Sequence, residues 1–435
     1  MTDYLPLYMF IITIAFLMLG YPAAFTLGGM ALLFGIPTLG ISIFQLLPLR
    51  IYGIMTNFTL LAVPLFIFMG VILEKSGVAN DLLKNLSNLF GSFKGGLAVA
   101  VVSVGALLGA TTGVVGATVI TLGIIAFPIM LRNNYDKSLS AGIIATSGTL
   151  GQVIPPSIVL ILLADIAGVP VGKLFLAAII PSVCLITGYI LYIVIKAKFI
   201  SPNDFGNIGG LEKRPNIRKA LISIIPSLAL ITIVLGSIIL GIASPTESGA
   251  LGCLGAIILS LIKKRFEFKK FFEAARYTAT LTSMVFIILI GATAFSLVFK
   301  GLGGDSLLRS TLTDLEAGKF VFILTSMLLI FLLGFFLDFI EISFILVPIL
   351  VPIASFLDIN LVWFTLLIAV NLQTSFLTPP FGFSIFYLKS VAPDCVTTID
   401  IYKGVIPFIC IQILVLSLLL LFPDTVTWLP EKIGP

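Results

Sequence analysis

Two matching stretches decide the fold: Gly148–Ser157, which reads GTLGQVIPPS, and Asn371–Gly382, which reads NLQTSFLTPPFG. Each stretch lies in a long apolar segment and carries two adjacent prolines. When the sequence is moved so that the first proline pair falls on the second, Pro128 also falls on Pro352 without a gap. Two earlier pairs of segments match in the same order: Leu19–Pro22 with Ala243–Pro245, and Phe66–Gly70 with Ile287–Gly291. The chain is therefore predicted to consist of two related halves.

Both halves have the same order of segments. Two spans separated by a Pro/Gly break are followed by an amphipathic connector, a third span, a long apolar stretch with a polar, glycine-bearing centre, the span broken at Pro-Pro, and a final span. Non-helical backbone at membrane depth is tolerated only where protein or a water-filled cavity surrounds it, so the polar-centred stretch predicts a re-entrant helical hairpin. The predicted units are residues 1–197 (first inverted repeat, hairpin about 95–130, broken helix about 138–166), 198–219 (cytoplasmic linker) and 220–435 (second inverted repeat, hairpin about 319–356, broken helix about 361–390).

The composition requires a membrane as the solvent. Hydrophobic residues make up 59% of the 435 residues and charged residues only 10%, whereas about a quarter of the residues of a soluble protein are charged. A span needs about 20 apolar residues. We therefore predict an all-α polytopic membrane protein of two inverted repeats, each with about five transmembrane helices and one re-entrant helical hairpin.

The distribution of charge predicts the orientation of the halves. The loop Lys263–Arg276 contains six basic residues, whereas its counterpart Ile36–Asn57 contains only Arg50. Basic loops stay in the cytoplasm, so the two loops are expected on opposite sides of the membrane, as an inverted repeat requires. The linker is then cytoplasmic, and both termini are expected in the periplasm.

The residue types exclude several classes of function. The chain has no histidine, its four cysteines form no C-x-x-C pair, and it has no phosphate-binding loop of the G-x-x-x-x-G-K-[ST] type. We expect no enzyme activity, no transition metal and no cofactor other than a coupling ion. Inverted repeats with broken helices are typical of secondary transporters, whose substrate and ion sites lie at the breaks.

The proline pairs predict sites for a cation. Proline in a helix frees the carbonyl of the residue four positions earlier, here Gly151 and Gln152 in the first half, and Ser375 and Phe376 in the second. A carbonyl in hydrocarbon is costly unless something satisfies it, and a dehydrated sodium ion fits carbonyl and hydroxyl oxygens. The alternative is a plain kink whose carbonyl is hydrogen-bonded by a neighbouring helix. The candidate ligands are Thr111, Thr112, Gly151, Ile154 and Pro156 in the first half, and Gly334, Ser375, Thr378 and Pro380 in the second.

Carboxylates and amides at membrane depth are candidates for substrate binding. Asp338 lies in the centre of the second hairpin, where either substrate binding or helix capping is expected. Asn371 and Gln373 precede the second break, where their amides would donate to a substrate carboxylate, and Thr149 holds the position equivalent to Gln373. Glu247 follows Ser-Pro-Thr, which predicts a cap at a helix start. Asp165 is expected to be exposed at a helix end.

These motifs resemble those of the large membrane subunit of TRAP transporters, the tripartite ATP-independent periplasmic transporters. The resemblance rests on Gly148–Ser157, Asn371–Gly382, the Pro245–Glu247 segment and the hairpin centre Gly334–Asp338, and it extends over nearly the whole chain. It implies sodium-coupled uptake of a small organic acid, an elevator-type movement of the hairpins and broken helices, and a bacterial inner membrane. It also implies two partners, a small four-span membrane subunit and a periplasmic substrate-binding protein.

The family's sodium sites carry over onto Thr112, Gly151, Ile154 and Pro156, and onto Gly334, Ser375, Thr378 and Phe381. The chain departs from the family pattern at the tip of the first hairpin, where Thr111-Thr112-Gly113 takes the place of a serine-rich sequence. An alternative is a stand-alone sodium/divalent-anion symporter of related inverted-repeat fold. A neighbouring four-span protein and a secreted binding protein would favour the tripartite system. The substrate itself is not encoded in these motifs.

Overall fold

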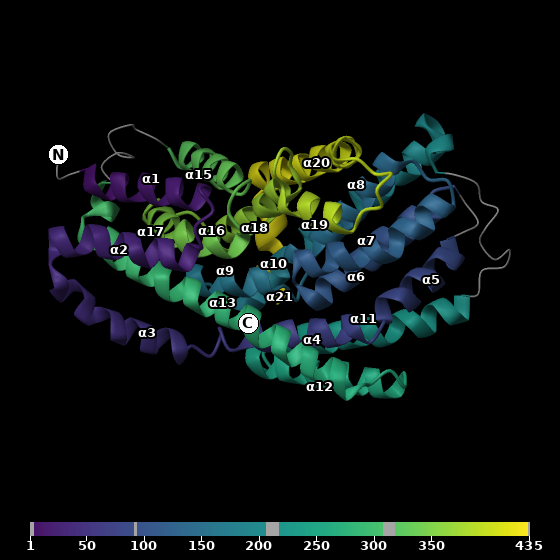
Figure 1. The fold of residues 1–435 in the computed structure, drawn as a ribbon, viewed down its shortest axis with the longest axis horizontal. Coiled ribbons are helices and arrows are strands. Elements are labelled where there is room, and N and C mark those ends of the chain that lie inside the picture. Colours follow the sequence, from purple (N-terminus) through teal and green to yellow (C-terminus); the bar gives the residue numbers. More distant parts are fainter. Residues whose placement is uncertain (1–3, 91–93, 206–216, 308–317, 434–435) are drawn as a thin grey trace.

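The computed structural model describes residues 4–90, 94–205, 217–307 and 318–433. Every secondary-structure element in this part of the chain is a helix, and the only β pairing among these residues is an isolated bridge between Tyr135 and Phe205. Figure 1 shows an elongated bundle of helices. The prediction of an all-α protein is confirmed.

The helices of the first half begin at α1 (Leu5–Met18) and end with the long helix α10. After α1 come α2 (Ala23–Leu39), α3 (Leu47–Met55), α4 (Ala62–Lys75), α5 (Val78–Phe90), α6 (Gly96–Thr112), α7 (Val115–Arg132), α8 (Lys137–Thr149), the 3-10 helix η3 (Leu150–Gln152), α9 (Ile158–Ala167) and finally α10 (Val171–Ile195). The stretch predicted as the first hairpin is occupied by α6 and α7, which pack against each other. Half of the predicted linker, residues 206–216, lies outside the described residues.

The helices of the second half follow a similar but not identical order. They are α11 (Ile217–Ile239), α12 (Pro245–Ile262), α13 (Phe268–Gly301), α15 (Lys319–Leu333), α16 (Phe339–Ile345), α17 (Val347–Phe356), α18 (Leu361–Leu377), α19 (Phe383–Val391), α20 (Thr398–Leu421) and α21 (Asp424–Ile433). The connector and third span of the first half are separate helices, α3 and α4. Their counterpart is a single helix of 34 residues, α13, so the expectation of the same segment order in both halves is wrong at this point.

Five of the described helices are long and apolar enough to cross a membrane by themselves, or up to seven segments if each of two bent pairs counts as one span. The bent pairs are α4 with α5, at 60°, and α16 with α17, at 48°. Eight further apolar helices have 10–17 residues, including parts of both broken helices. The number of five crossings per half depends on these shorter helices and stays a prediction.

The helices pack in two groups. The outer group consists of α1–α4 and α11–α13, in which α2 and α4 pack along α13 and α12 packs along α4, and α5 packs on both α11 and α6. The hairpin group consists of α6–α9 and α15–α19, in which α6 and α7 pack on α8, and α15 packs on α18. Figure 1 shows α4, α11 and α12 along the lower side and α15, α18 and α19 above them. The helices α10 and α20 pack against the hairpin group.

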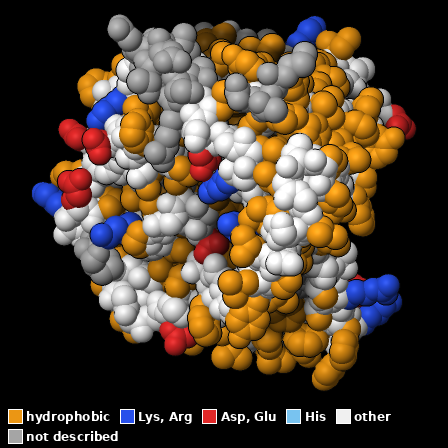
Figure 2. Space-filling view, turned by 90° about the vertical axis from the view of Figure 1, so that its left-hand side faces the viewer, with side chains coloured by type: hydrophobic (Ala, Val, Ile, Leu, Met, Phe, Trp, Pro, Cys, Tyr) orange, Lys and Arg blue, Asp and Glu red, His pale blue; other side chains and the backbone are white. Residues whose placement is uncertain are grey.

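The outside of the bundle is apolar, as lipid contact requires. Figure 2 shows wide areas of hydrophobic side chains on the face that includes α1, α2 and α3. Phe25, Leu33 and Leu49 are among the exposed side chains there. The basic loop after α12 instead lies against the turn between α4 and α5, where Arg265 and Lys263 both form ion pairs with Asp81.

Candidate functional site

The first helix break separates α8 from α9. Helix α8 continues into η3 and stops before the cis peptide between Pro155 and Pro156, and α9 begins at Ile158. The tip of the first hairpin lies beside this break. There α6 ends at Thr112, and Gly113 turns the chain with a φ of +60°, a conformation that glycine adopts without steric cost.

The hairpin meets the break through backbone atoms. A Cβ atom added to Gly109 of α6 would lie 2.6 Å from the Cα of Gly151, and one added to Gly151 would lie 2.7 Å from the Cα of Gly109. No side chain fits between these two residues. Both positions therefore need glycine, because the two backbones approach too closely for a Cβ atom.

The second break repeats this contact. Helix α18 ends at Leu377 before the cis peptide between Pro379 and Pro380, and the second hairpin passes beside it. A Cβ atom added to Gly334 would lie 2.7 Å from the Cβ of Ser375. In the alignment of the halves Ser375 corresponds to Gly151, and Gly334 lies one position from the counterpart of Gly109. Both breaks are thus contacted by a hairpin glycine, at places one residue apart in the alignment of the halves.

Threonine hydroxyls supply oxygen atoms at the first hairpin tip. Thr111 and Thr112 both donate to the carbonyl of Leu108, at 2.8 Å and 3.0 Å, and the hydroxyls of Thr112 and Thr118 lie 2.7 Å apart. A hydroxyl that donates its proton to a carbonyl keeps lone pairs for other partners. The orientation is therefore compatible with a cation beside the tip.

The second break has the same arrangement of hydroxyls on the broken helix itself. Ser375 donates to the carbonyl of Leu372 at 2.9 Å, and Thr378 donates to that of Thr374 at 2.7 Å. Their lone pairs are likewise available to a cation. Ser375 is fully buried and Thr378 is half-buried.

Serine side chains satisfy one predicted carbonyl at each break. Ser157 donates to the carbonyl of Gln152 at 2.7 Å, and Ser384 donates to that of Phe376 at 2.8 Å. Gln152 and Phe376 are equivalent positions of the two halves. At these two carbonyls the chain itself supplies the hydrogen-bond partner, as in a plain kink, although the donor is a serine after the break and not a neighbouring helix.

The remaining sodium candidates differ in their surroundings. Pro156 is buried and Ile154 is half-buried, so both stand in an enclosed break. Pro380 is exposed, and its carbonyl accepts a hydrogen bond from Tyr402 at 2.6 Å. The side chain of Phe381 is 42% exposed, and its ring lies 4.8 Å from that of Phe336 in the second hairpin.

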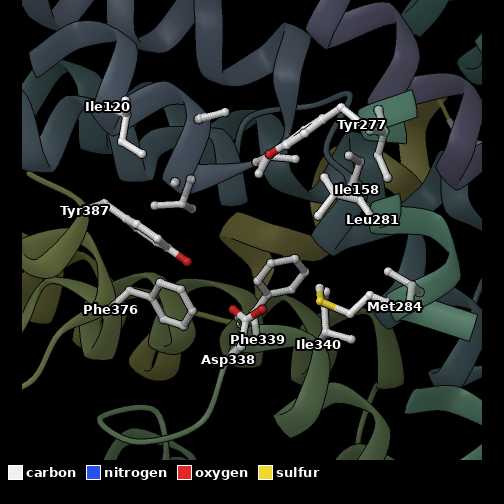
Figure 3. A pocket seen from close by; sticks show the side chains of 16 residues that line it. Ile120, Ile158, Tyr277, Leu281, Met284, Asp338, Phe339, Ile340, Phe376 and Tyr387 are labelled. Carbon is white, nitrogen blue, oxygen red and sulfur yellow. Dashed lines mark hydrogen bonds between the residues drawn. The ribbon is translucent and has the colours of Figure 1, made fainter. Parts of the chain in front are cut away.

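A cavity of about 200 Å³ lies between the two hairpins and helix α13. Its walls come from the first turns of α7, the start of α16, the broken helices and the face of α13 that carries Tyr277, Leu281 and Met284. Figure 3 shows the carboxylate of Asp338 at the base of this space, with the hydroxyls of Tyr277 and Tyr387 pointing into it. Asp338 also accepts a hydrogen bond from the backbone N–H of Phe339 at 2.7 Å, which caps α16.

Of the four substrate candidates, only Asp338 lines this cavity. The amide of Asn371 donates to the carbonyl of Met327 in α15 at 2.6 Å. Gln373 and Thr149 are fully buried in their helices, and the amide of Gln373 has no hydrogen-bond partner among the described residues. Their part in substrate binding stays a prediction, without a cavity contact to support it.

Two further carboxylates have structural partners. Glu247 forms a capping box with Ser244 at the start of α12, so the predicted cap is confirmed. Asp165 is half-buried and accepts a hydrogen bond from the amide of Asn57 at 2.8 Å. The expectation that Asp165 is exposed is wrong, because the segment before α4 covers it.

Comparison with known proteins identifies the family. The family described as tripartite ATP-independent periplasmic transporter, DctM component, matches residues 10–425. The chain belongs to this family. It is a TRAP large permease subunit, a membrane transport protein and not an enzyme.

Full-length TRAP permease proteins are similar along the chain. A C4-dicarboxylate TRAP transporter large permease protein, DctM, of Vibrio cholerae is 28% identical over 454 residues, covering 98% of each chain. An ectoine TRAP transporter large permease protein, TeaC, of Halomonas elongata is 29% identical and covers 96% of this chain and 97% of that protein. A sialic acid TRAP transporter large permease protein, SiaM, of Vibrio cholerae is 27% identical and covers 95% of each.

A solved structure shares the fold of this TRAP subunit. The crystal structure of the Alcanivorax borkumensis YdaH transporter, described as having an unusual topology, aligns with a TM-score of 0.65 at 15% sequence identity. The alignment covers 95% of this chain and 98% of that one. The agreement extends over both halves.

The sequence alone did not indicate several residues that line the cavity of the TRAP subunit. Tyr277, Phe339, Phe376 and Tyr387 line it together with Asp338. Each is an aromatic residue in an apolar stretch, which sequence alone does not distinguish from a core residue. Gly109 was also not predicted as a site residue, although its near match with Gly334 of the second hairpin indicated it.

Proposed function

We propose that this chain imports a small organic acid together with sodium across a bacterial inner membrane, as the large subunit of a tripartite system. A small four-span subunit accompanies it in the membrane, and a periplasmic binding protein delivers the acid. The observation that carries the proposal is the repeated contact of a hairpin glycine with a helix break, Gly109 with Gly151 and Gly334 with Ser375.

Sodium coupling is supported by the chemistry around these contacts. Hydroxyl and carbonyl oxygens are present at the first hairpin tip and at the second break, and oxygen atoms of this kind are what a dehydrated sodium ion takes in broken-helix sites. The cavity lies between the two hairpins that contact the breaks, so a cation at either hairpin would stabilise the closed form of the substrate site.

An elevator movement is supported by the boundary between the outer and hairpin groups. Helix α4 lies along the first hairpin, and a Cβ atom on its Gly70 would lie 2.5 Å from the Cα of Thr112, a backbone contact that must part when the groups slide. Two side-chain hydrogen bonds between described residues cross this boundary, one near each end of α4: Asn57 with Asp165 at 2.8 Å, and Thr121 with Glu74 at 2.5 Å. A boundary with few polar contacts offers little resistance to sliding.

Uptake by the reconstituted system tests the proposal. The large and small subunits are placed in liposomes, and the binding protein is added outside with its radiolabelled acid. We expect accumulation only with an inward sodium gradient, and none when the small subunit or binding protein is left out. Uptake that is unchanged when potassium or choline replaces sodium would refute the coupling, and uptake without the partners would favour a stand-alone symporter.

Cross-linking tests the movement separately. Cysteines at positions 57 and 165, in a chain whose four native cysteines are replaced, are bridged by a short bifunctional thiol reagent. We expect the bridge to stop uptake, and a reducing agent to restore it, because the bridge joins the outer group to the hairpin group. Full uptake by the bridged protein would contradict an elevator movement. The single-cysteine variants treated with the same reagent are the controls.

A further inference from the structure

The cavity between the hairpins combines one carboxylate with aromatic rings. Asp338 lies at the start of α16, and the rings of Phe339, Phe376 and Tyr387 come from α16, α18 and α19. Tyr277 adds a fourth ring from α13. Figure 3 shows these side chains around one space, with the Asp338 carboxylate next to the rings of Phe339 and Phe376.

The charge of this lining is unusual for a site that receives an acid. Among the described residues that line the cavity there is one acidic side chain, Asp338, and no lysine or arginine. Sodium ions at the breaks would offset the net charge of a dicarboxylate, but the lining offers no lysine or arginine to separate its carboxylates from that of Asp338, and like charges in contact repel. The lining instead matches a positive group, because a carboxylate pairs with it and aromatic faces attract it.

We propose that the acid carried by this chain is a compact zwitterion, whose ammonium or alkylammonium group binds between Asp338 and the aromatic rings. This inference rests on the proposed function and narrows its substrate class. Aromatic rings around a carboxylate are the surroundings in which proteins bind alkylated ammonium ions. The first turn of α7 also borders the cavity, and a helix N-terminus favours the carboxylate at the other end of such a molecule.

The size of the cavity agrees with a small zwitterion. Its volume is about 200 Å³, whereas a cavity of about 150 Å³ holds a molecule the size of benzene. A solute of roughly six to twelve non-hydrogen atoms therefore fits. Hydroxyl groups of Tyr277 and Tyr387 add hydrogen-bonding capacity within an otherwise apolar wall.

A pair of isosteric probes tests the proposal directly. Glycine betaine and 3,3-dimethylbutyrate have the same shape, but only the first carries a positive charge; succinate serves as the dicarboxylate. Equilibrium binding is measured by calorimetry on the complex of the large and small subunits in nanodiscs with sodium chloride. We expect glycine betaine to bind roughly tenfold more tightly than 3,3-dimethylbutyrate, the size of a desolvated cation–π contact, and succinate to bind most weakly.

Two variants assign the preference to the named residues. Asp338→Asn removes the charge but keeps a good helix cap, and Phe339→Leu removes a ring but keeps the cap and an apolar side chain. We expect both to lose most of the preference for glycine betaine. Asp424→Asn, at the start of α21 and outside the cavity lining, is the matched control and keeps it.

The outcomes separate this inference from the proposed function. Equal binding of the two isosteric probes, absence of glycine betaine binding, or a preference that survives both variants overturns the zwitterion assignment. The zwitterion assignment also fails if Asp338→Asn changes the sodium titration but keeps the preference for glycine betaine, because Asp338 then acts on the sodium ion. Sodium-driven uptake of the acid of the binding protein would stand in each of these cases. Conversely, sodium-independent uptake would refute the coupling without changing the probe preference.

Discussion

The two helix breaks share one geometry but differ in how they are enclosed. At the first, Pro155 and Pro156 are buried and the hairpin contact joins two glycines, backbone to backbone. At the second, Pro380 and Phe381 are exposed and the hairpin glycine meets the Ser375 side chain. The hydroxyls also differ, because those of the first site belong to the hairpin, whereas those of the second belong to the broken helix.

We infer from this difference that the two breaks have different roles. A contact between two backbones cannot relax, so the first break is suited to hold the hairpin group together. A contact with a side chain, at a break that is open to its surroundings, has more freedom to change. We therefore expect the first break to control stability and the second to control the response to sodium.

The largest effect is expected from Gly109→Ala. The added methyl group would overlap the backbone of Gly151, and overpacking of this kind costs about 1–3 kcal/mol. Sodium-driven uptake should fall to near background, and the thermal midpoint of the purified subunit should drop. Gly334→Ala should have a smaller effect on both, because its neighbour is a side chain.

A double variant with Ser375→Gly tests further how the two breaks differ. Ser375→Gly gives the second break the Gly–Gly pair of the first, and it should relieve most of the cost of Gly334→Ala in the double variant. Equal thermal midpoints for the Gly109→Ala and Gly334→Ala proteins would contradict these different roles.

The next effect is expected from Thr378→Val. Losing one hydroxyl at the second break should raise the sodium concentration for half-maximal uptake roughly tenfold, which corresponds to about 1.4 kcal/mol of binding free energy. Thr112→Val should raise it less, because the hydroxyl of Thr118 lies 2.7 Å from that of Thr112 and remains.

A neighbouring threonine provides the control for this series. Thr374 is buried one turn before Thr378, and its hydroxyl donates to the carbonyl of Val370 at 2.9 Å. Thr374→Val makes the same chemical change outside the proposed ligands and should leave the sodium titration unchanged. A wild-type sodium response of the Thr378→Val protein would show that the second site is misplaced.

The smallest effect is expected from the serines that donate to the breaks. Ser157→Ala leaves the buried carbonyl of Gln152 without its donor and should cost about 1 kcal/mol of unfolding free energy. Ser384→Ala should cost about the same, because Ser384 and the carbonyl-bearing Phe376 are just as buried. Thermal or denaturant unfolding measures both losses, and wild-type stability of either variant would contradict the role of its serine.

The sequence predicted what depends on local chemistry. Proline pairs, glycines and the Ser244–Glu247 cap act within a few residues, so helix breaks and the start of α12 could be placed from the sequence alone. Which face of a helix a side chain occupies is a matter of packing. Asn371 was expected to meet substrate, but its amide binds the carbonyl of Met327 in a neighbouring helix.

The cavity could not be predicted for a related reason. Its lining comes from segments as distant as α4, α7, α13 and α19, and their aromatic residues have no local feature that separates them from core residues. Helix α13 also had to be continuous for Tyr277 and Met284 to share one face. From the sequence, the two parts of α13 were expected as a connector followed by a separate span.

Equilibrium binding of radioactive sodium to the purified complex is the most direct test of the central claim, that each break holds one cation. The account predicts two sodium ions per large subunit, with Thr112→Val and Thr378→Val each weakening a different one and the double variant weakening both. A single sodium ion, or the same sodium binding curve for both single variants and wild type, would contradict it.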